Sequence, residues 1–174
     1  MDTKEQVKDS FINKLFEADI IEEKKLLESA NLFHLNLFER HRIAVITIES
    51  ERDLLEQGNV LDVEAEKTRI WMEVKELLSI YDQRMILTRK DSYIIAIVPE
   101  IQEGKEPNAY WGKLCAYLRK ATKGKASAKK NIYIGIGGKT EELTDYYLCY
   151  KQAIQSHKVV ISHFNKEGYA FFED

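Results

Sequence analysis

The sequence of 174 residues predicts an α+β fold, and three observations support this fold class. Apolar residues change along the chain between helical spacing and short runs rich in β-branched residues. Two of these runs, residues 84–89 and 92–99, are separated only by Lys90 and Asp91, which predicts a tight β-hairpin. Hydrophobic residues make up 44% of the chain, which is enough for one substantial core.

The chain opens with a predicted helical pair within residues 1–40. In residues 4–17, Val7, Phe11 and Leu15 lie on one helical stripe, and a second apolar pattern at helical spacing follows. Together with the adjacent stripe of Ile12 and Phe16, this stripe is wider than a short appendage needs to dock on its own domain. An exposed apolar face usually marks a partner. We therefore predict that Val7, Phe11 and Leu15 form a homodimer interface. The alternative is that the stripe folds back onto its own domain or contacts a preceding domain that this fragment lacks.

The rest of the chain alternates between predicted strands and helices. In order, these are strand 42–49, helix 62–81, strands 84–89 and 92–99, helix 107–121 and strand 131–137. This βαββαβ order is the split βαβ arrangement, in which right-handed crossovers place two helices on one face of a sheet. An extra helix and a short strand at 169–173 complete the chain. The predicted fold is therefore a ferredoxin-like core in residues 41–174, preceded by the helical pair.

Charge and composition bound the function. A net charge of −3 and a pI near 5.9 give no overall attraction to nucleic acid or to an anionic membrane. No apolar run approaches the ~20 residues of a membrane helix, and the first residues lack secretory-signal character. We therefore expect a cytoplasmic protein without membrane contact.

One segment departs from this charge balance. Residues 108–139 contain eight basic residues and no acidic one. A phosphate-rich partner is one interpretation, but the segment lacks the exposed aromatic residues expected between its charges for single-strand binding. A solvated loop around residues 119–130 is the favoured interpretation.

The segment IYIGIGGKTEELTDYY suggests a strand followed by a phosphate-binding loop, but it fits neither common motif. A GxxxxGK[ST] loop would need glycine in place of Tyr133, and a GxGxxG fingerprint would need glycine in place of Thr140. We therefore interpret Gly135, Gly137 and Gly138 as structural glycines. The first two would let a helix approach the strand backbone, and the last two would permit a turn with positive φ.

Other chemical motifs are weak. The four histidines, which show neither i, i+4 pairing nor an accompanying carboxylate cluster, are His34, His41, His157 and His163. Their predicted positions at helix ends or in loops favour surface or capping roles. No serine or cysteine lies in a GxSxG context. We therefore predict no metal site and no cofactor.

Three segments together resemble a known family. They are ESANLFHLNL leading into HRIAVITIE, the hairpin LTRKDSYIIAIVP, and YIGIGGKTEELTDYYLCYKQAIQSHKVV. In the last of these, a strand ending in Gly-x-Gly leads to a helix with a Tyr-x-x-Ala pattern, which Tyr150 and Ala153 match. In these segments and in the order of its elements, the chain resembles the GGDEF-like domain of bacterial transcription regulators of the purine-catabolism (PucR) and carbohydrate-diacid (CdaR) type.

The resemblance also raises an enzymatic alternative, because diguanylate cyclases are built on this fold. Their activity is implied to need a Gly-Gly-Asp/Glu-Glu-Phe hairpin, in which glycines accommodate the nucleotide and carboxylates hold divalent metal. The corresponding residues 90–94 are KDSYI, and Glu49 is the only carboxylate near a metal-ligand position. Arg-x-x-Asp, the inhibitory product-binding motif of those enzymes, does not occur. We expect no enzymatic activity, and the candidate ligand-binding residues are Glu49, Lys90, Asp91 and Ser92.

The predicted function is that of a non-catalytic regulatory domain that senses an unknown small-molecule effector, self-associates, or does both. The family implies a C-terminal helix-turn-helix, and none follows the final strand. DNA contact is therefore expected only through a domain that this chain lacks. The alternative is a degenerate nucleotide-binding domain related to diguanylate cyclases.

Overall fold

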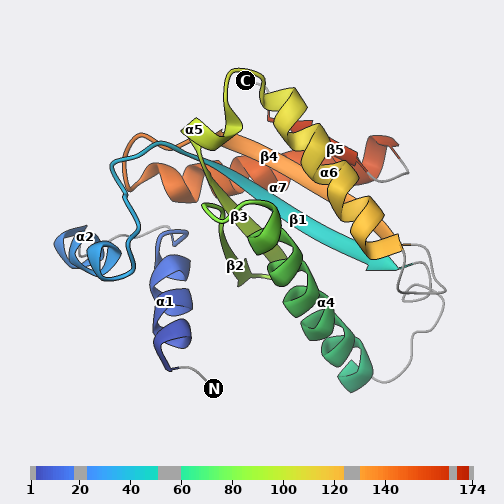
Figure 1. Ribbon diagram of the computed structural model, residues 1–174, viewed down its shortest axis with the longest axis horizontal. Coiled ribbons are helices and arrows are strands. Elements are labelled where there is room, and N and C mark those ends of the chain that lie inside the picture. Colours follow the sequence, from blue (N-terminus) through green and yellow to red (C-terminus); the bar gives the residue numbers. More distant parts are fainter. Residues whose placement is uncertain (1–2, 18–22, 51–59, 124–129, 165–167, 173–174) are drawn as a thin grey trace.

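A computed structural model of the protein describes residues 3–17, 23–50, 60–123, 130–164 and 168–172 (Figure 1). Its helices and strands are, in chain order, α1 (Thr3–Lys14), α2 (Glu23–Leu32), β1 (His41–Ser50), α4 (Val60–Tyr81), β2 (Ile86–Lys90), β3 (Tyr93–Pro99), α5 (Glu100–Glu103), α6 (Pro107–Lys123), β4 (Lys130–Lys139), α7 (Asp145–Phe164) and β5 (Gly168–Phe171). The described strands form one sheet in the order β2-β3-β1-β4-β5. All neighbouring strands are antiparallel except β4 and β5, which are parallel.

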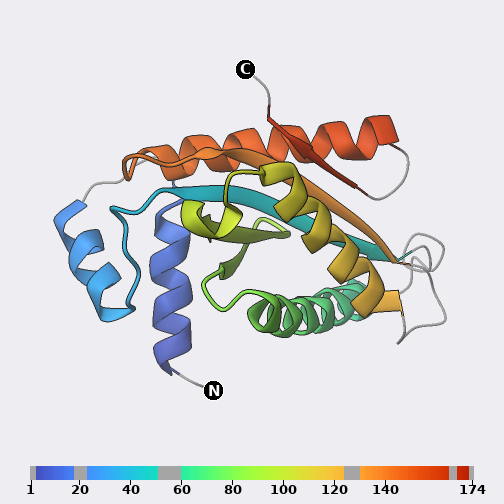
Figure 2. The same ribbon diagram turned by 45° about the horizontal axis from the view of Figure 1, so that its top comes forward.

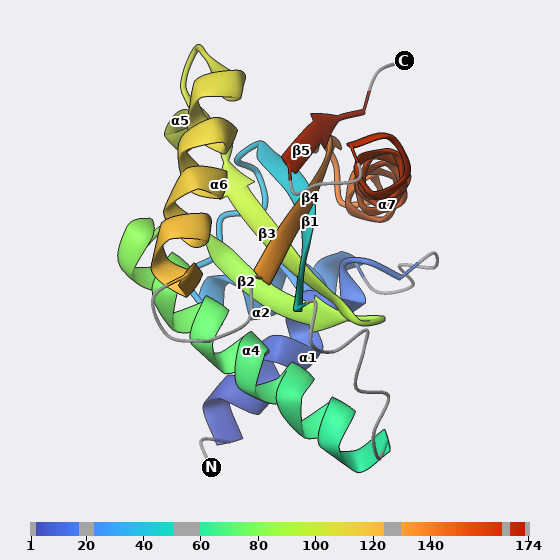
Figure 3. The same cartoon turned by 90° about the vertical axis from the view of Figure 1, so that its right-hand side faces the viewer.

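This topology confirms the predicted α+β fold with a βαββαβ core. The strand β3 inserts between β1 and β2, which are connected through α4, and α6 connects β3 to β4. Both crossover helices cover the same face of the sheet, as right-handed connections require, whereas α7 covers the opposite face (Figure 3). The strand β5 extends the sheet at its β4 edge.

The central strands are almost continuously apolar because helices cover both faces of the sheet. In β1, Ala44 and Ile46 belong to a first core shared with α4 and α6. Ile43 and Val45 belong to a second core shared with α1, α2 and α7. The two-residue period of a strand therefore divides one sheet between two hydrophobic cores.

The N-terminal helix α1 packs on the sheet and does not present its apolar stripe to solvent. Phe11 and Leu15 are 6% and 0% exposed, and Phe11 stacks on Phe33 within the second core. Val7 alone among the three predicted interface residues is exposed. The prediction that Val7, Phe11 and Leu15 form a dimer stripe is therefore wrong for its two buried members. The physical reason is that α7 covers the β1 and β4 part of this face, and α1 covers the part at β2.

The predicted division between residues 1–40 and 41–174 does not separate two cores. Leu26 and Ala30 of α2 belong to the second core together with side chains of α1 and α7. The chain between α2 and β1 then passes beside α1 before it enters the sheet (Figure 2). The helical pair is therefore packed as part of the same hydrophobic unit as the sheet.

The β2–β3 hairpin turns one residue later than predicted. Lys90 pairs with Tyr93, so the two-residue loop consists of Asp91 and Ser92. Both loop residues have positive φ, 51° and 71°, as a type I′ turn requires. Non-glycine residues rarely adopt this backbone conformation, so strain is concentrated at the tip of the hairpin.

The helix α7 lies directly against the backbone of β4 at two glycines. A Cβ atom at Gly135 would lie 2.2 Å from the carbonyl oxygen of Ala153. A Cβ atom at Gly137 would lie 2.2 Å from the carbonyl oxygen of Cys149. Because neither distance leaves room for a side chain, only glycine allows the helix to occupy this position.

Gly138 extends this contact without forming a turn. The strand β4 continues through Gly137 and Gly138 to Lys139, and neither glycine has positive φ. The predicted turn at these two glycines is therefore wrong. Instead, the N–H of Gly138 donates a hydrogen bond of 2.9 Å to Oε1 of Gln152, which ties the end of β4 to α7.

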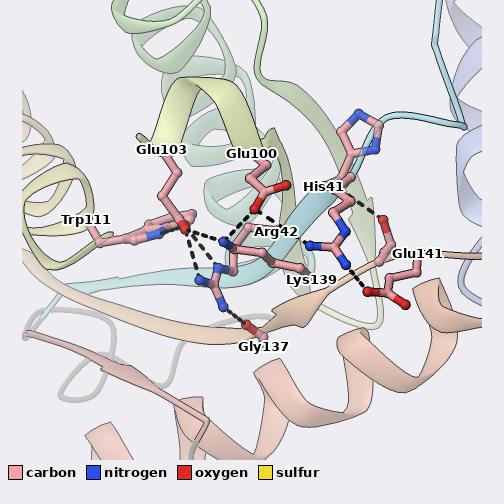
Figure 4. Close-up of polar contacts among 10 residues, drawn as sticks. His41, Arg42, Glu100, Glu103, Trp111, Gly137, Lys139 and Glu141 are labelled. Atoms are coloured by element: carbon pink, nitrogen blue, oxygen red, sulfur yellow. Dashed lines mark hydrogen bonds and ion pairs between the residues drawn. The ribbon is translucent and has the colours of Figure 1, made fainter. Parts of the chain in front are cut away.

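A buried ion pair joins β1 to the short helix α5. Oxygens of the fully buried Glu103 accept hydrogen bonds of 2.9 Å from Nε and Nη2 of Arg42 and one of 2.7 Å from Nε1 of Trp111 (Figure 4). Arg42 also donates to the carbonyl oxygen of Gly137, and Nζ of Lys139 lies 3.9 Å from Glu103. The buried carboxylate is thus fully partnered, which is the condition for a stable buried charge.

The close packing of α7 predicts a strong effect of Gly137→Val on stability. We expect the substitution to lower the free energy of unfolding by about 1–3 kcal/mol in the absence of ligand, because the helix backbone must move away. Urea unfolding measures this change. Gly168→Ala is the control, since a Cβ atom there meets nothing within 4 Å. Equal stability of the two variants would contradict the packing role.

The buried ion pair predicts a larger effect of Glu103→Gln. This nearly isosteric change leaves the Arg42 guanidinium without its counter-charge, which typically costs about 3–5 kcal/mol. Glu100→Gln is the control, because Glu100 pairs with Lys139 at a partly exposed site and its loss should change stability little. Similar unfolding midpoints for both variants in a urea titration would show that the Glu103 charge is not needed.

Candidate functional site

The sheet has a notch where β1 extends beyond its pairing with β3. Among the described strands, β3 pairs with β1 only as far as Ile46, whereas β4 follows β1 to Ser50. The hairpin tip at Asp91 and Ser92 therefore stands beside residues 47–50 of β1. In a sheet of this topology, the notch leaves backbone and side chains of two strands open to a ligand.

A cleft of about 340 Å³ occupies this notch and is lined by residues of α4, α7, β1 and the β2–β3 hairpin. This volume suits a small molecule. One wall is apolar and includes Ile48, Ile70 and Trp71. The charged residues that line the cleft are three cations and two carboxylates, namely Lys67, Arg89, Lys158, Glu49 and Asp91. The described lining therefore has a small excess of positive charge.

Tyr150 of α7 connects the hairpin tip to the helix. Its hydroxyl donates a hydrogen bond of 3.2 Å to Oδ2 of Asp91. Burial and the neighbouring Asp91 carboxylate raise the pKa of Tyr150, so the phenol remains protonated and can donate at neutral pH. Three residues later, Ala153 packs on Gly135. The Tyr-x-x-Ala pattern thus combines a contact to the hairpin with close packing on β4.

His157 lies one turn beyond Ala153 and is 3% exposed at the base of the cleft. Its Nε2 forms a hydrogen bond of 2.6 Å with Oγ1 of Thr47, and the rings of Tyr93 and Tyr133 meet it edge-on. Burial lowers the pKa of His157 to about 4. The imidazole is therefore neutral at pH 7 and offers the cleft a hydrogen-bonding group without charge.

The structure brings together three of the four predicted ligand-binding residues. Glu49, Asp91 and Ser92 all line the cleft, and all three are exposed. Lys90, the last residue of β2, is not among the described residues that line it. The predicted residues converge because the end of β1 and the tip of the hairpin meet at the same edge of the sheet.

Sequence reasoning missed the cationic lining and the buried histidines. The three cations come from three different elements, and no local motif marks them. The prediction of surface or capping histidines is wrong for His157 and His41, which are 3% and 1% exposed. A signal for His157 was present, since it lies four residues after Ala153 on the helix face that packs against the glycines.

Residues 18–159 match the family model described as the GGDEF-like domain. The match extends over more than half of the chain and includes the four strands of the βαββαβ core. The chain belongs to the GGDEF-like domain family. No curated protein compared with this GGDEF-like domain gives a significant sequence match.

A solved structure similar to this GGDEF-like domain is the GGDEF domain of YfiN (TpbB) from Pseudomonas aeruginosa. The two share 15% sequence identity with a TM-score of 0.51, over 88% of this chain and 92% of that chain. At this level of identity, the similarity concerns the fold. The chemistry of the cleft must therefore be argued from the residues of this chain.

The cleft of the GGDEF-like domain offers two carboxylates to a cation in its described part, Glu49 and Asp91. Magnesium is commonly held by one or two carboxylates together with water and substrate phosphates. Asp91 already accepts the hydrogen bond from Tyr150. Among the described residues, no group of three or more His, Cys, Asp or Glu side chains is arranged to hold a metal ion.

Two further expectations concern charge and hydropathy. In the basic segment, Lys139 donates a hydrogen bond of 3.0 Å to Glu100, so this cation is paired. The predicted loop around residues 119–130 is wrong for residues 119–123, which continue α6, and residues 124–129 lie outside the described residues. No helix in the described part of the chain is both long enough and apolar enough to cross a membrane.

Because His157 is buried, we expect the free energy of unfolding to decrease in mild acid. Below pH 6.5 the unfolded chain takes up a proton at His157 that the folded chain resists until about pH 4. The free energy of unfolding should therefore decrease as the pH falls from about 6.5 to about 4, by on the order of 3 kcal/mol for this group. Burial also lowers the pKa of His41, which adds to the decrease.

Urea unfolding between pH 4 and pH 7 tests this expectation. His157→Gln should remove part of the pH dependence, whereas His34→Asn, at an exposed position, should retain it. An unchanged pH dependence in His157→Gln would show that this imidazole does not resist protonation.

Proposed function

We propose that this GGDEF-like domain is a non-catalytic regulatory domain of a bacterial transcription regulator of the PucR/CdaR type. The observation that carries the proposal is the hairpin at residues 90–94. Its sequence, KDSYI, lacks the two glycines on which the nucleotide lies in the diguanylate cyclases that the family resembles. Asp91 and Ser92 instead place side chains at the turn, in a strained type I′ conformation.

The charges at the hairpin support the same proposal. Metal-assisted phosphoryl transfer requires oxygen ligands that converge on divalent cations. Asp91 is held by Tyr150, and Lys90 places a positive charge next to it in the chain. Glu49 is then the one exposed carboxylate of the described lining without a hydrogen-bond or ion-pair partner among the described residues.

In the proposed regulator, the domain acts by binding a small-molecule effector, by self-association, or by both. A homodimer stays a prediction, and its interface would have to use surfaces other than the buried Phe11 and Leu15. Recognition of DNA would belong to a separate helix-turn-helix domain. A cytoplasmic location follows from this role and is proposed with it.

A degenerate nucleotide-binding domain is the second candidate function. The observation that favours it is the lining of the cleft, where Lys67, Arg89 and Lys158 could contact phosphates. The half-buried Trp71 provides an apolar surface beside them. In this alternative, the domain would bind a nucleotide and hold it without turnover.

The proposed function predicts that the domain forms no cyclic dinucleotide from GTP with Mg²⁺ or Mn²⁺. The physical reason is the loss of both hairpin glycines and the shortage of metal ligands. Chromatography of the reaction mixture measures the product. A cyclic dinucleotide that disappears in Glu49→Ala would overturn the proposal.

Thermal unfolding with GTP separates the two candidate functions. A ligand at 100 times its dissociation constant stabilises the fold by about 2.7 kcal/mol. Stabilisation by GTP that is lost in Lys67→Ala and kept in Lys120→Ala, an exposed lysine of α6 outside the cleft, would favour the nucleotide-binding alternative. We expect that GTP stabilises neither the unsubstituted domain nor the two variants.

A further inference from the structure

A second cavity, of about 380 Å³, lies at the opposite end of β1. It is lined by α1, by the chain between α2 and β1, and by β2 and the end of β3, and Figure 2 shows α1 and that chain side by side. His41 at this cavity and residues 46–49 at the notch are five to eight residues apart along β1, so roughly 17–26 Å of strand separates the two sites. We call this cavity the His41 pocket.

His41 places an oriented polar group in this pocket. Its side chain is 1% exposed, and its Nδ1 forms a hydrogen bond of 2.8 Å with the hydroxyl of the buried Tyr146. Its backbone N–H donates to Oγ1 of Thr140, and its ring points away from the Arg42–Glu103 ion pair (Figure 4). Since Tyr146 occupies Nδ1, Nε2 is the ring nitrogen within reach of a ligand in the pocket.

In one tautomer of this pair, Nε2 is a donor. Burial raises the pKa of Tyr146 and lowers the pKa of His41, so the phenol is protonated and the imidazole is neutral at pH 7. When the phenol donates its proton to Nδ1, the neutral ring carries its own proton on Nε2. A ligand that accepts hydrogen bonds is matched to this tautomer.

The charged lining of the pocket leaves one positive charge without a counter-charge. Nη2 of Arg84 lies 3.2 and 3.4 Å from the carboxylate oxygens of Glu39, so these two charges balance. Lys8 of α1 is half-buried at the pocket and has no ion-pair partner among the described residues. One lysine beside a neutral imidazole suits a ligand with a single negative charge.

The remaining lining is largely apolar. The apolar residues that line the pocket are Phe11, Ile12, Phe33, Leu35, Ile86 and Pro99. The rings of Phe11 and Phe33 stack with their centroids 5.6 Å apart, which gives one wall a flat aromatic surface. Pockets of this size, with an apolar wall and a few oriented polar groups, suit small organic ligands.

From this geometry we propose that the His41 pocket binds a small organic monocarboxylate with an apolar body. The carboxylate accepts from Nζ of Lys8 and from Nε2 of His41, and the body lies against the aromatic wall. This proposal names a ligand class for the ligand-sensing role proposed above. A regulatory effect of the ligand rests on that proposed function. Turnover of GTP at the notch would overturn the proposed function without affecting binding in this pocket, so the two proposals fail separately.

Titration of the full chain with benzoate, followed by ¹H–¹⁵N NMR, tests the proposal. We expect saturable shifts at residues 8–12, 33–41 and 83–86, together with the ring signals of His41. Benzyl alcohol, which has the ring without the charge, and inorganic phosphate, which has charge without an apolar body, should each bind at least tenfold more weakly. Hexanoate should bind at the same residues, because the pocket recognises a carboxylate on an apolar body.

Variants at partly exposed positions give the matched comparison. Lys8→Glu should weaken benzoate binding at least tenfold, whereas Lys67→Glu, at the notch, should leave it unchanged. Three results would each overturn the proposal: no saturable shift with either carboxylate, shifts confined to the notch, or equal binding by Lys8→Glu. Because Lys8 lies outside the hydrophobic cores, a folded spectrum of this variant is expected and is read in the same experiment.

Discussion

The contact between α7 and the backbone of β4 is the constraint on which the rest of the structure depends. Gly135 and Gly137 allow carbonyl oxygens of the helix to come within a distance that any Cβ atom would prevent. The helix is thereby fixed over β4 and β1, and the remaining part of that face, at β2, is covered by α1. One hydrophobic core then forms on each face of the sheet. The apolar stripe of α1 packs into one of these cores.

The same contact sets the geometry of the notch. Tyr150, Ala153 and His157 follow one another at helical spacing, so fixing Ala153 on Gly135 also fixes the other two side chains. Tyr150 then reaches the hairpin tip, and His157 reaches Thr47 of β1. The polar groups of the cleft are therefore positioned by backbone packing, which is more rigid than positioning by long side chains.

The first two residues of β1 place polar side chains on opposite faces of the sheet. His41 faces α1 and enters its pocket, while Arg42 faces α6 and pairs with the buried Glu103. The GGDEF-like fold of this chain thus carries polar groups at both ends of β1. The fold does not decide the chemistry, which depends on the side chains placed at each end.

The sequence by itself determined the order of helices and strands, the existence of the hairpin and the structural character of Gly135 and Gly137, because periodicity and glycine act over short distances along the chain. It did not determine what covers an apolar stripe, since periodicity shows which face of a helix is apolar and not which surface it meets. Only the tertiary structure decided that Phe11 is buried, that Asp91 meets Tyr150 and that two histidines lie in the interior. These contacts join residues far apart in sequence. They form only when α7 and α1 are packed on the sheet.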